Sequence, residues 1–494
     1  MKRLLVVDLA YTRDEVNEPI NIDTLLDCLE ELYDTVSVDI LYRTLGDTAP
    51  FTPEDYDIIL VSTKISSGDA LDEILSRKSQ TPTIVGGVIA TYAHRELLSR
   101  YPDVILSLGE CEQNIKETVS ALLTLPTVDA AKEHLIKASV SGLAFMHRGA
   151  RYHADIRPVD LSRITKPLTH RALSRTLAAS GLVRIEGSRG CPWNACRFCA
   201  CRYKYRCDHR PFPLSKTLGE IAMLSRAGVK TLYFTDEDFF GSREHFFSLF
   251  GEILQRKERK EFSEELSFWG STSVYTLIRF GEKLDEAIAL MKAVGIGVLF
   301  LGIESGSDSQ LLRFNKGVTA NENLFILKKL KEAGINVDVG FIMFDALTTL
   351  DEVRENLAFT RRSGLDKTVS RLAKPLRVIP YTDMAKEYEA LSLLTSDTDL
   401  GELDHTYKIR DEKVAALYEA LTVLDSHILD AANRLQAKIR MASGYEDEDT
   451  LKALTLLRGV EYRFIEDFLA AFSENSFDPD LLHALLQKHL ARLL

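Results

Sequence analysis

The strongest constraint on the fold is an alternation of short apolar runs with helical stretches over the first 120 residues. The runs are rich in β-branched residues and almost unbroken, as is typical of strands that helices cover on both faces. They span residues 4–7, 36–41, 58–61, 83–85 and 104–108. This alternation predicts an α/β unit with a doubly wound parallel sheet, which we place at residues 1–125.

A second alternating region begins at Val183. Its predicted strands are residues 183–186, 231–235, 266–270, 298–303, 336–344 and 376–379, with helices between them. For one of these helices we expect Ser215 as the N-cap and Gly228 at the end. Six strand–helix units make most of a parallel barrel, so residues 179–385 are predicted to form a partial (β/α)6 barrel of the TIM type.

The remaining segments do not show this alternation of strands and helices. Residues 126–178 lack a strong period and are interpreted as a linker with local β structure near residues 142–152. Residues 386–494 are predicted to be a helical domain, because Leu417, Leu421, Leu424 and Ile428 recur at helical spacing. A length of 494 residues fits about three domains at roughly 150 residues each.

Composition narrows the functional classes. The formal net charge of -12 argues against a broad nucleic-acid footprint, which needs clustered Lys and Arg. The longest apolar run, residues 296–303, is far shorter than the roughly 20 residues of a membrane-spanning helix. The apolar run at residues 4–7 is too short for the core of a signal peptide. We therefore expect a cytoplasmic protein without a membrane partner.

Five of the seven cysteines lie between residues 191 and 207, directly after the first predicted barrel strand. Cys191, Cys196 and Cys199 have the spacing Cys-x4-Cys-x2-Cys. Three thiolates can hold three irons of a [4Fe–4S] cluster and leave the fourth iron open to another ligand. Two alternatives remain at this point: a zinc site completed by Cys201, Cys207 or His209, and a structural or electron-transfer cluster.

The loop at residues 187–199 resembles that of the radical S-adenosylmethionine (SAM) superfamily, in the branch with an N-terminal cobalamin (B12)-binding-like domain. The usual family spacing is Cys-x3-Cys-x2-Cys, so the first gap is one residue longer here. Phe198 matches the aromatic residue that precedes the last cysteine. Later segments resemble further family motifs in the same order: residues 233–238, 302–308 with 315–317, and 340–345.

The resemblance implies a SAM site at the ends of the barrel strands. A contact with the SAM amino group is implied for the segment after the second strand, a position near the ribose for Glu304, and one beside the adenine for the fifth strand. Ser273 stands where many relatives have an Arg that meets the SAM carboxylate. The implied SAM residues are Thr235, Asp236, Glu237, Ser273, Glu304, Ser305 and Ile342.

Three loops of the first unit resemble those of cobalamin-binding relatives, namely residues 61–66, 86–91 and 109–112. The implied cobalamin residues are Ser62, Ser66, Gly86, Gly87, Thr91 and Gly109. The Asp-x-His-x-x-Gly motif that supplies a histidine to cobalt is absent, and His94 is the only histidine before residue 134. We therefore expect cobalamin to bind without a protein ligand to cobalt. The plainer alternative is that these glycines only form turns.

A basic and aromatic stretch follows the cysteine loop. It contains Arg202, Tyr203, Lys204, Tyr205, Arg206, His209 and Arg210. Such a stretch can be a solvated loop, can bind a small anion, or can stack single-stranded nucleic acid. Cys201 and Cys207 are interpreted as plain loop cysteines or as hydrogen donors to a substrate radical.

The family resemblance implies an enzyme in which an electron from the reduced cluster splits SAM into methionine and a 5′-deoxyadenosyl radical. The leading hypothesis is cobalamin-dependent methylation of a small metabolite or natural product. The alternatives are a cobalamin-independent radical dehydration, rearrangement or epimerisation, and a non-catalytic cluster- or corrinoid-binding protein. The expected partners are a small-molecule substrate and an electron donor such as flavodoxin or ferredoxin, without nucleic acid.

Overall fold

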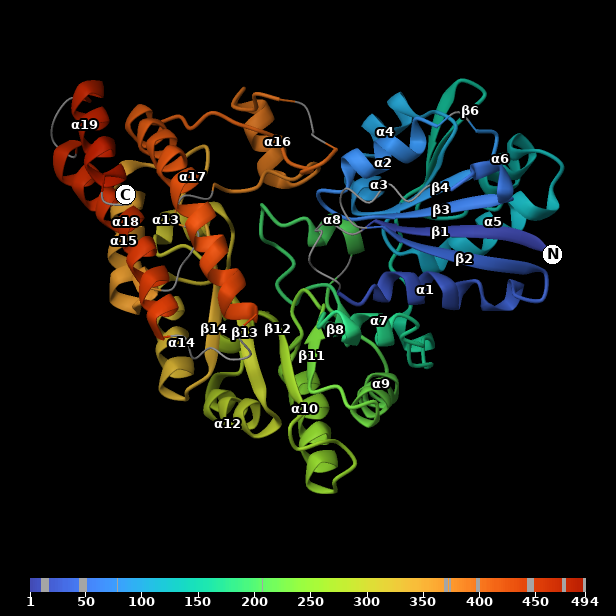
Figure 1. The fold of residues 1–494 in the computed structure, drawn as a ribbon, viewed down its shortest axis with the longest axis horizontal. Coiled ribbons are helices and arrows are strands. Elements are labelled where there is room, and N and C mark those ends of the chain that lie inside the picture. The colour runs from blue at the N-terminus through green and yellow to red at the C-terminus, as the bar shows by residue number, and fades with distance from the viewer. Residues whose placement is uncertain are drawn as a thin grey trace.

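The computed structural model describes residues 1–9, 17–43, 51–77, 79–206, 208–367, 372, 375–396, 400–441, 448–472 and 477–491, and no side chains between 429 and 458. Figure 1 shows two larger sheets, one from the N-terminal third and one from the middle of the chain, with C-terminal helices beside the second. None of the described helices is long and apolar enough to cross a membrane.

The first sheet has the order β2-β1-β3-β4-β5-β6-β7 within the described residues. Neighbouring strands from β1 to β5 pair in parallel, and β6 and β7 continue the sheet antiparallel. The strands are β1 (Lys2–Leu9), β2 (Val36–Arg43), β3 (Ile58–Thr63), β4 (Thr83–Gly87), β5 (Ile105–Ser107), β6 (Leu143–His147) and β7 (Ala150–His153). The five predicted strands and the doubly wound parallel arrangement are therefore confirmed.

Helices cover both faces of this sheet (Figure 1). They are α1 (Ile20–Cys28), α2 (Gly68–Leu75), α3 (Val88–Tyr92), α4 (His94–Arg100), α5 (Ile115–Thr124) and α6 (Val128–Lys137). Alternate side chains of a strand point to opposite faces. Leu5 and Val7 of β1 therefore join one buried core with α2, α3 and α4, whereas Leu4 and Val6 join the other with α1, α5 and α6.

The segment interpreted as a linker is more structured than predicted. Local β structure near residues 142–152 is confirmed, but β6 and β7 extend the first sheet and α6 packs on it. After β7 the chain crosses to the second unit and forms α7 (Leu173–Ala178) before the next strand. The exact division of the chain into domains remains a prediction.

The second large sheet has the order β14-β13-β12-β11-β8, all parallel. Its strands are β8 (Val183–Ile185), β11 (Thr231–Phe234), β12 (Ser267–Ser273), β13 (Ile296–Glu304) and β14 (Asn336–Phe341). Between them lie α8 (Cys201–Tyr205), α9 (Leu214–Arg226), α10 (Arg243–Glu258), α11 (Val274–Ile278), α12 (Leu284–Val294), α13 (Asp308–Arg313), α14 (Ala320–Glu332) and α15 (Leu350–Ser363), together with the short antiparallel pair β9 (Ser188–Arg189) and β10 (Arg210–Pro211).

Two local predictions are wrong. The helix expected to be capped by Ser215 is α9, which begins at Leu214 after Pro213. Pro213 is the N-cap and no side chain caps the helix, so the helix begins earlier than a cap at Ser215 would place it. The sixth predicted strand, residues 376–379, forms only isolated bridges, at Pro375 and Val378. Pro375 and Pro380 bracket this short run and remove two ladder donors.

The last part of the chain is helical, as predicted. It contains α16 (Asp383–Ala390), α17 (Glu412–Met441), α18 (Glu448–Phe472) and α19 (Pro479–Leu490). The predicted apolar face of α17 is confirmed, because Leu417, Leu421, Leu424 and Ile428 are buried in the same core as the second sheet.

Candidate active site

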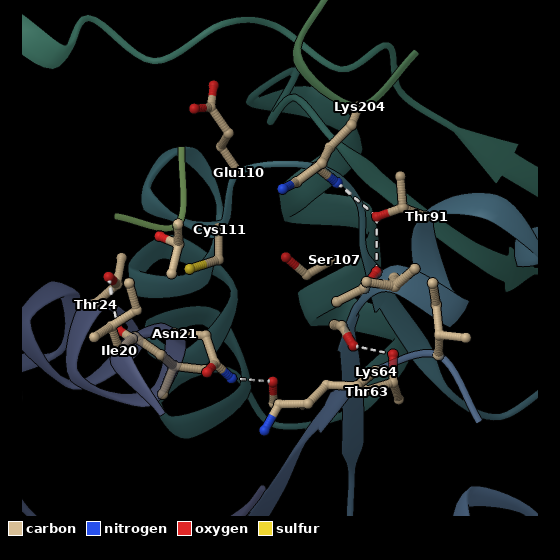
Figure 2. Close-up of a pocket in the computed structure, with 18 of the residues that line it drawn as sticks. Ile20, Asn21, Thr24, Thr63, Lys64, Thr91, Ser107, Glu110, Cys111 and Lys204 are labelled. Atoms are coloured by element: carbon tan, nitrogen blue, oxygen red, sulfur yellow. Dashed lines mark hydrogen bonds between the residues drawn. The ribbon is translucent and has the colours of Figure 1, made fainter. Parts of the chain in front are cut away.

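A cavity of about 740 Å³ lies where the carboxyl ends of the first sheet face the second unit. Figure 2 shows side chains from α1, from the loops after β3 and β5, and from α8 around this hollow. The second unit contributes Glu186, Arg189, Lys204 and Thr235 to its wall. Open α/β sheets bind ligands beyond the carboxyl ends of their strands, which is where this cavity lies.

All six residues predicted for cobalamin line this one cavity: Ser62, Ser66, Gly86, Gly87, Thr91 and Gly109. Gly87 has a φ of 90°, and a Cβ there would lie 2.3 Å from the carbonyl oxygen of Thr63. Thr91 donates to the Gly87 carbonyl oxygen (2.8 Å) and accepts from the Gly109 N–H (3.0 Å). The glycine turns are thus tied together by one threonine, which holds the rim of the cavity in place.

The part of the cavity inside the first unit combines apolar walls with a polar end. The apolar walls come from Ile20, Leu25, Leu60, Ile84 and Ile115. At the polar end Lys64 Nζ lies 3.0 Å from Asp8, and Asn21 donates to Ser62 Oγ (2.7 Å). No histidine is among the described residues that line the cavity. The expectation that no protein histidine binds cobalt stays a prediction.

The wall between the two units carries a buried charge network that the sequence did not reveal. The Arg189 guanidinium lies 2.8 Å from Glu110, 2.7 Å from Glu112 and 2.9 Å from Glu186, and Arg210 reaches Glu110 at 3.0 Å. Burial alone would lower the pKa of Arg189, but the three carboxylates hold it well above its usual value. Glu110 and Glu112 come from the first unit, so this network fastens the two units at the cavity.

The cysteine loop is fixed by the segment after α13. Trp193 Nε1 donates to the carbonyl oxygen of Asn315 (2.6 Å), whose side-chain amide donates to Ala195 (2.8 Å). A Cβ on Gly317, which has a φ of 72°, would lie 2.8 Å from the Trp193 ring. The residues of the longer first gap therefore pack on residues 315–317, and Trp193 has a packing role.

The thiols of the loop influence one another electrostatically, because the charge of Cys199 raises the pKa of both Cys191 and Cys196. Burial is the larger cause and raises these pKa values to about 11 and about 12. Backbone N–H groups of Trp193 and Asn194 hydrogen-bond to the sulfur of Cys191 and lower its pKa. Cys199 is exposed, and hydrogen bonds from the thiol and backbone of Cys201 lower its pKa.

This arrangement fits an iron–sulfur cluster, which needs several thiolates around a shared space and N–H donors near the sulfurs. Lys316 adds a positive charge that lowers the pKa of Cys196 and Cys199. Among the described residues, no three His, Cys, Asp or Glu side chains converge as ligands of a single ion. Cys207, considered above for a zinc site, lies outside the described residues.

Two of the predicted SAM residues stand out, one by its place and one by its backbone. Thr235 lines the cavity after β11. Glu304 ends β13 at a break in the pairing register, with a φ of 64°, and its carboxylate forms an ion pair with Lys316 at 3.0 Å. Such a strained backbone at a strand end is typical of a functional position. Lys316 lies in the segment 315–317, which resembles a family motif. Its ion pair with Glu304 could not be predicted from the sequence.

The other predicted SAM residues are engaged by their own chain. Asp236 accepts from the Gly187 N–H and the Ser188 hydroxyl, and burial raises its pKa to about 8. Glu237 accepts from the Gly190 N–H at 3.3 Å, and the hydroxyls of Ser273 and Ser305 donate to Asp238 and to Asn356. Ile342 donates its N–H to the Glu304 carbonyl oxygen. A direct contact of these residues with SAM remains a prediction.

The comparisons with known proteins agree with this geometry. The family model "Radical SAM superfamily" matches residues 185–360. The chain is 28% identical over 365 residues to 4'-phospho-dehydrooxetanocin synthase of Priestia megaterium, covering 71% of this chain and 45% of that protein. It is 24% identical over 371 residues to an uncharacterised methyltransferase of Pyrococcus horikoshii, covering 72% and 76%. The chain thus spans less than half of the first of these relatives.

Solved structures show the same fold over the whole chain. The cobalamin-dependent SAM radical enzyme OxsB, with aqua-cobalamin and SAM bound, matches with a TM-score of 0.82 at 20% identity, over 99% of this chain and 75% of that chain. The radical SAM methyltransferase TsrM from Kitasatospora setae matches with a TM-score of 0.64 at 18% identity, over 81% and 80%. A radical SAM domain implies a [4Fe–4S] cluster and SAM as cofactors. Residues 185–360 therefore match the radical SAM superfamily, and the chain has the fold of the cobalamin-dependent radical SAM enzyme OxsB.

Proposed function

We propose that this chain is a radical SAM enzyme that holds cobalamin in the cavity between its two sheets and methylates an unactivated carbon of a small molecule. The observation that carries the proposal is the shared cavity, because the predicted cobalamin residues and the Thr235 strand end of the radical SAM domain line the same space. When bound, the cluster and SAM supply a 5′-deoxyadenosyl radical, and cobalamin supplies a carrier for a methyl group.

Each unit has a separate task in this proposal. Cys191, Cys196 and Cys199 hold the cluster, and the Glu304–Lys316 pair orients SAM beside it. The glycine turns around Gly86 and Gly109 leave room for a bulky cofactor and let the backbone approach it. The charge network of Arg189 closes the seam between the units and keeps water from entering there.

The relatives support the proposal at the level of cofactor class. The OxsB structure is described with aqua-cobalamin and SAM, and the TsrM structure with cobalamin and a [4Fe–4S] cluster. One relative is named a methyltransferase and another a synthase, so methyl transfer is the leading reaction and a radical rearrangement, dehydration or epimerisation is its rival. The proposal also includes a small-molecule substrate, a one-electron donor such as flavodoxin or ferredoxin, and a cytoplasmic location.

The decisive experiment uses the chain purified without oxygen and loaded with iron and sulfide. Hydroxocobalamin is added, the mixture is gel-filtered, and iron, corrinoid and 5′-deoxyadenosine formed from SAM are measured together. We expect all three in the protein fractions. SAM cleavage without bound corrinoid would refute methyl transfer and favour a cobalamin-independent radical reaction. A fully loaded cluster without SAM cleavage would refute enzymatic radical chemistry altogether.

A further inference from the structure

Three exposed arginines gather near the cysteine loop although the chain as a whole is acidic. We call Arg95 of α4, Arg151 of β7 and Arg206 after α8 the arginine patch. None of them forms an ion pair with an Asp or Glu side chain in the part of the chain that the structure describes. Burial lowers the pKa of His153, and all three arginines lower it further against the charge of Asp155. The three guanidinium groups therefore all lie close enough to His153 to influence its charge.

Behind the arginine patch lies a column of four aromatic rings. The ring centroids of His153 and His94 are 4.9 Å apart, those of His94 and Tyr381 5.3 Å, and those of Tyr381 and Tyr203 4.6 Å. Arg206 lies over the Tyr203 ring at 4.3 Å, and Arg95 lies near the Tyr381 ring at 5.9 Å. The column joins the first unit, α8 and the segment before α16.

The column ends at the cysteine loop. Tyr203 belongs to α8, which begins two residues after Cys199, and its ring is 5.6 Å from that of Tyr92. The Tyr92 hydroxyl donates to the carbonyl oxygen of Ala200 at 2.9 Å. Ala200 directly follows Cys199 in the chain. Ring contacts thus lead from the exposed His153 to Tyr92, which is hydrogen-bonded to the residue beside a proposed cluster ligand.

The packing of the column decides between the partners that a basic and aromatic surface can bind. Both faces of Tyr381 are covered, by Tyr203 and His94, and Arg206 covers Tyr203. Single-stranded nucleic acid binds to open aromatic faces, which this column does not offer. Exposed arginines without ion-pair partners attract an acidic protein surface and guide its orientation.

We propose that the arginine patch is the docking surface of an acidic one-electron donor protein, of the flavodoxin or ferredoxin class. This inference rests on the proposed function, because it needs a cluster held by the three cysteines. The reduced flavin or iron–sulfur centre of the donor loses one electron and the cluster gains it, and no bond is formed or broken. The aromatic column brings the docked donor within a few ring contacts of Cys199.

The test uses the cluster-loaded chain and a bacterial flavodoxin in its hydroquinone form as the probe. The patch variant carries Arg95→Glu, Arg151→Glu and Arg206→Glu. The control variant carries Arg226→Glu, Arg259→Glu and Arg362→Glu, which are exposed arginines elsewhere on the chain and change the net charge equally. Two quantities are measured, the dissociation constant at several salt concentrations and the rate of cluster reduction by flavodoxin, followed by its absorbance.

We expect flavodoxin to bind the patch variant at least about tenfold more weakly than the control variant, with a shallower salt dependence. Cluster reduction and SAM cleavage driven by dithionite, which needs no docking, should be equal in both variants. Equal flavodoxin affinity in the two variants, or no binding to the unmodified chain, would overturn the proposal. So would tight binding of an oligonucleotide that only the patch variant loses. Failure of dithionite to support SAM cleavage would instead refute the proposed function.

Discussion

The strands of the two sheets end in different kinds of residue near the shared cavity. The strands of the first sheet end in small residues, such as Ser62, Gly86 and Ser107, which leave space. The strands of the radical SAM domain end in acidic residues, such as Glu186, Asp236 and Glu304, each of which is held by partners of its own chain. The strand ends of the first sheet contribute room, and those of the radical SAM domain contribute acidic side chains.

The difference follows from what each kind of ligand requires. A bulky cofactor needs volume and backbone approach, which small side chains supply without cost in charge. Buried carboxylates need hydrogen bonds or counter-charges, since an unpaired buried charge is strongly unfavourable. The units meet at Arg189, where carboxylates from both of them surround one guanidinium. We therefore expect substitutions in the first unit to impair cobalamin binding, and substitutions in the radical SAM domain to impair the cluster and SAM binding.

The largest effect is expected on the charged side, at the cluster. Replacing Cys191, Cys196 and Cys199 with Ala should remove bound iron and sulfide and abolish SAM cleavage, because a cluster needs several thiolates and only Cys201 would remain beside the loop among the described cysteines. Metal analysis and visible absorbance measure the first effect, and product formation measures the second. Cys28→Ala, on α1 and away from the loop, is the control and should keep its cluster. A cluster retained by the triple variant would refute the assignment.

The next effect is expected on the side that supplies room. A Cβ on Gly86 meets nothing closer than Ser107, at 3.8 Å, so Gly86→Leu should fill the cavity without straining the backbone. We expect cobalamin affinity to fall by about a hundredfold or more, measured by gel filtration and spectral titration, with SAM cleavage unchanged. Gly251→Leu, at another unhindered glycine on α10, should have no effect. Unchanged corrinoid binding by Gly86→Leu would place the cofactor elsewhere.

Both sheets were predictable because their strands carry a local signal, the β-branched run between helical stretches. The sixth predicted strand shows the limit of that signal. Three of its four residues, Leu376, Val378 and Ile379, are apolar, yet Pro375 and Pro380 leave too few donors for a ladder. The local β structure near residues 142–152 was predicted, but not that it extends the first sheet, because pairing of β6 with β5 depends on a contact between distant residues and not on local period.

The cobalamin loops and the charged wall of the site also differed in how well the sequence predicted them. Glycines and serines at strand ends are visible in a sequence, so all six residues predicted for cobalamin line one cavity. The Arg189 network was missed because Glu110 and Arg189 are 79 residues apart and nothing local relates them. The roles of Ser273 and Ser305 were likewise open, since only the fold shows that their hydroxyls hold Asp238 and Asn356.

A smaller effect is expected at Glu304, where SAM binding and the stability of the fold can be measured separately. Glu304→Ala leaves Lys316 buried without its counter-charge, which should lower the free energy of unfolding by about 3–5 kcal/mol and weaken SAM binding. The double variant Glu304→Ala/Lys316→Met removes both charges, so it should regain most of the stability but not the affinity. Thermal unfolding and equilibrium dialysis with SAM measure the two quantities. Normal SAM affinity in the double variant would show that the pair only stabilises the fold.

The smallest effect concerns a buried group of ion pairs around His170, at the contact between the two units. His170 is buried between Glu18 at 2.8 Å and Glu220 at 3.1 Å, and Glu220 also pairs with Lys216 at 2.8 Å. Burial alone would lower the pKa of His170, but the two carboxylates raise it from 6.5 to about 9. A pKa raised in the folded state stabilises the fold fully below the unfolded value of 6.5, and this stability is lost as the pH rises through about 9.

Raising the pH from 6 to above 9 should therefore lower the free energy of unfolding by at most about 3 kcal/mol through this group. His170→Gln should be less stable than the unmodified chain at pH 6 and should lose the part of the pH dependence that falls between 6.5 and 9. His134→Gln, at an exposed histidine of α6, should keep the normal pH dependence. Denaturant unfolding at pH 6, 7.5 and 9 measures the slopes. If His170→Gln and the unmodified chain share one slope, the contact between the units is held by interactions other than this ion pair, such as those of Arg189 and Arg171.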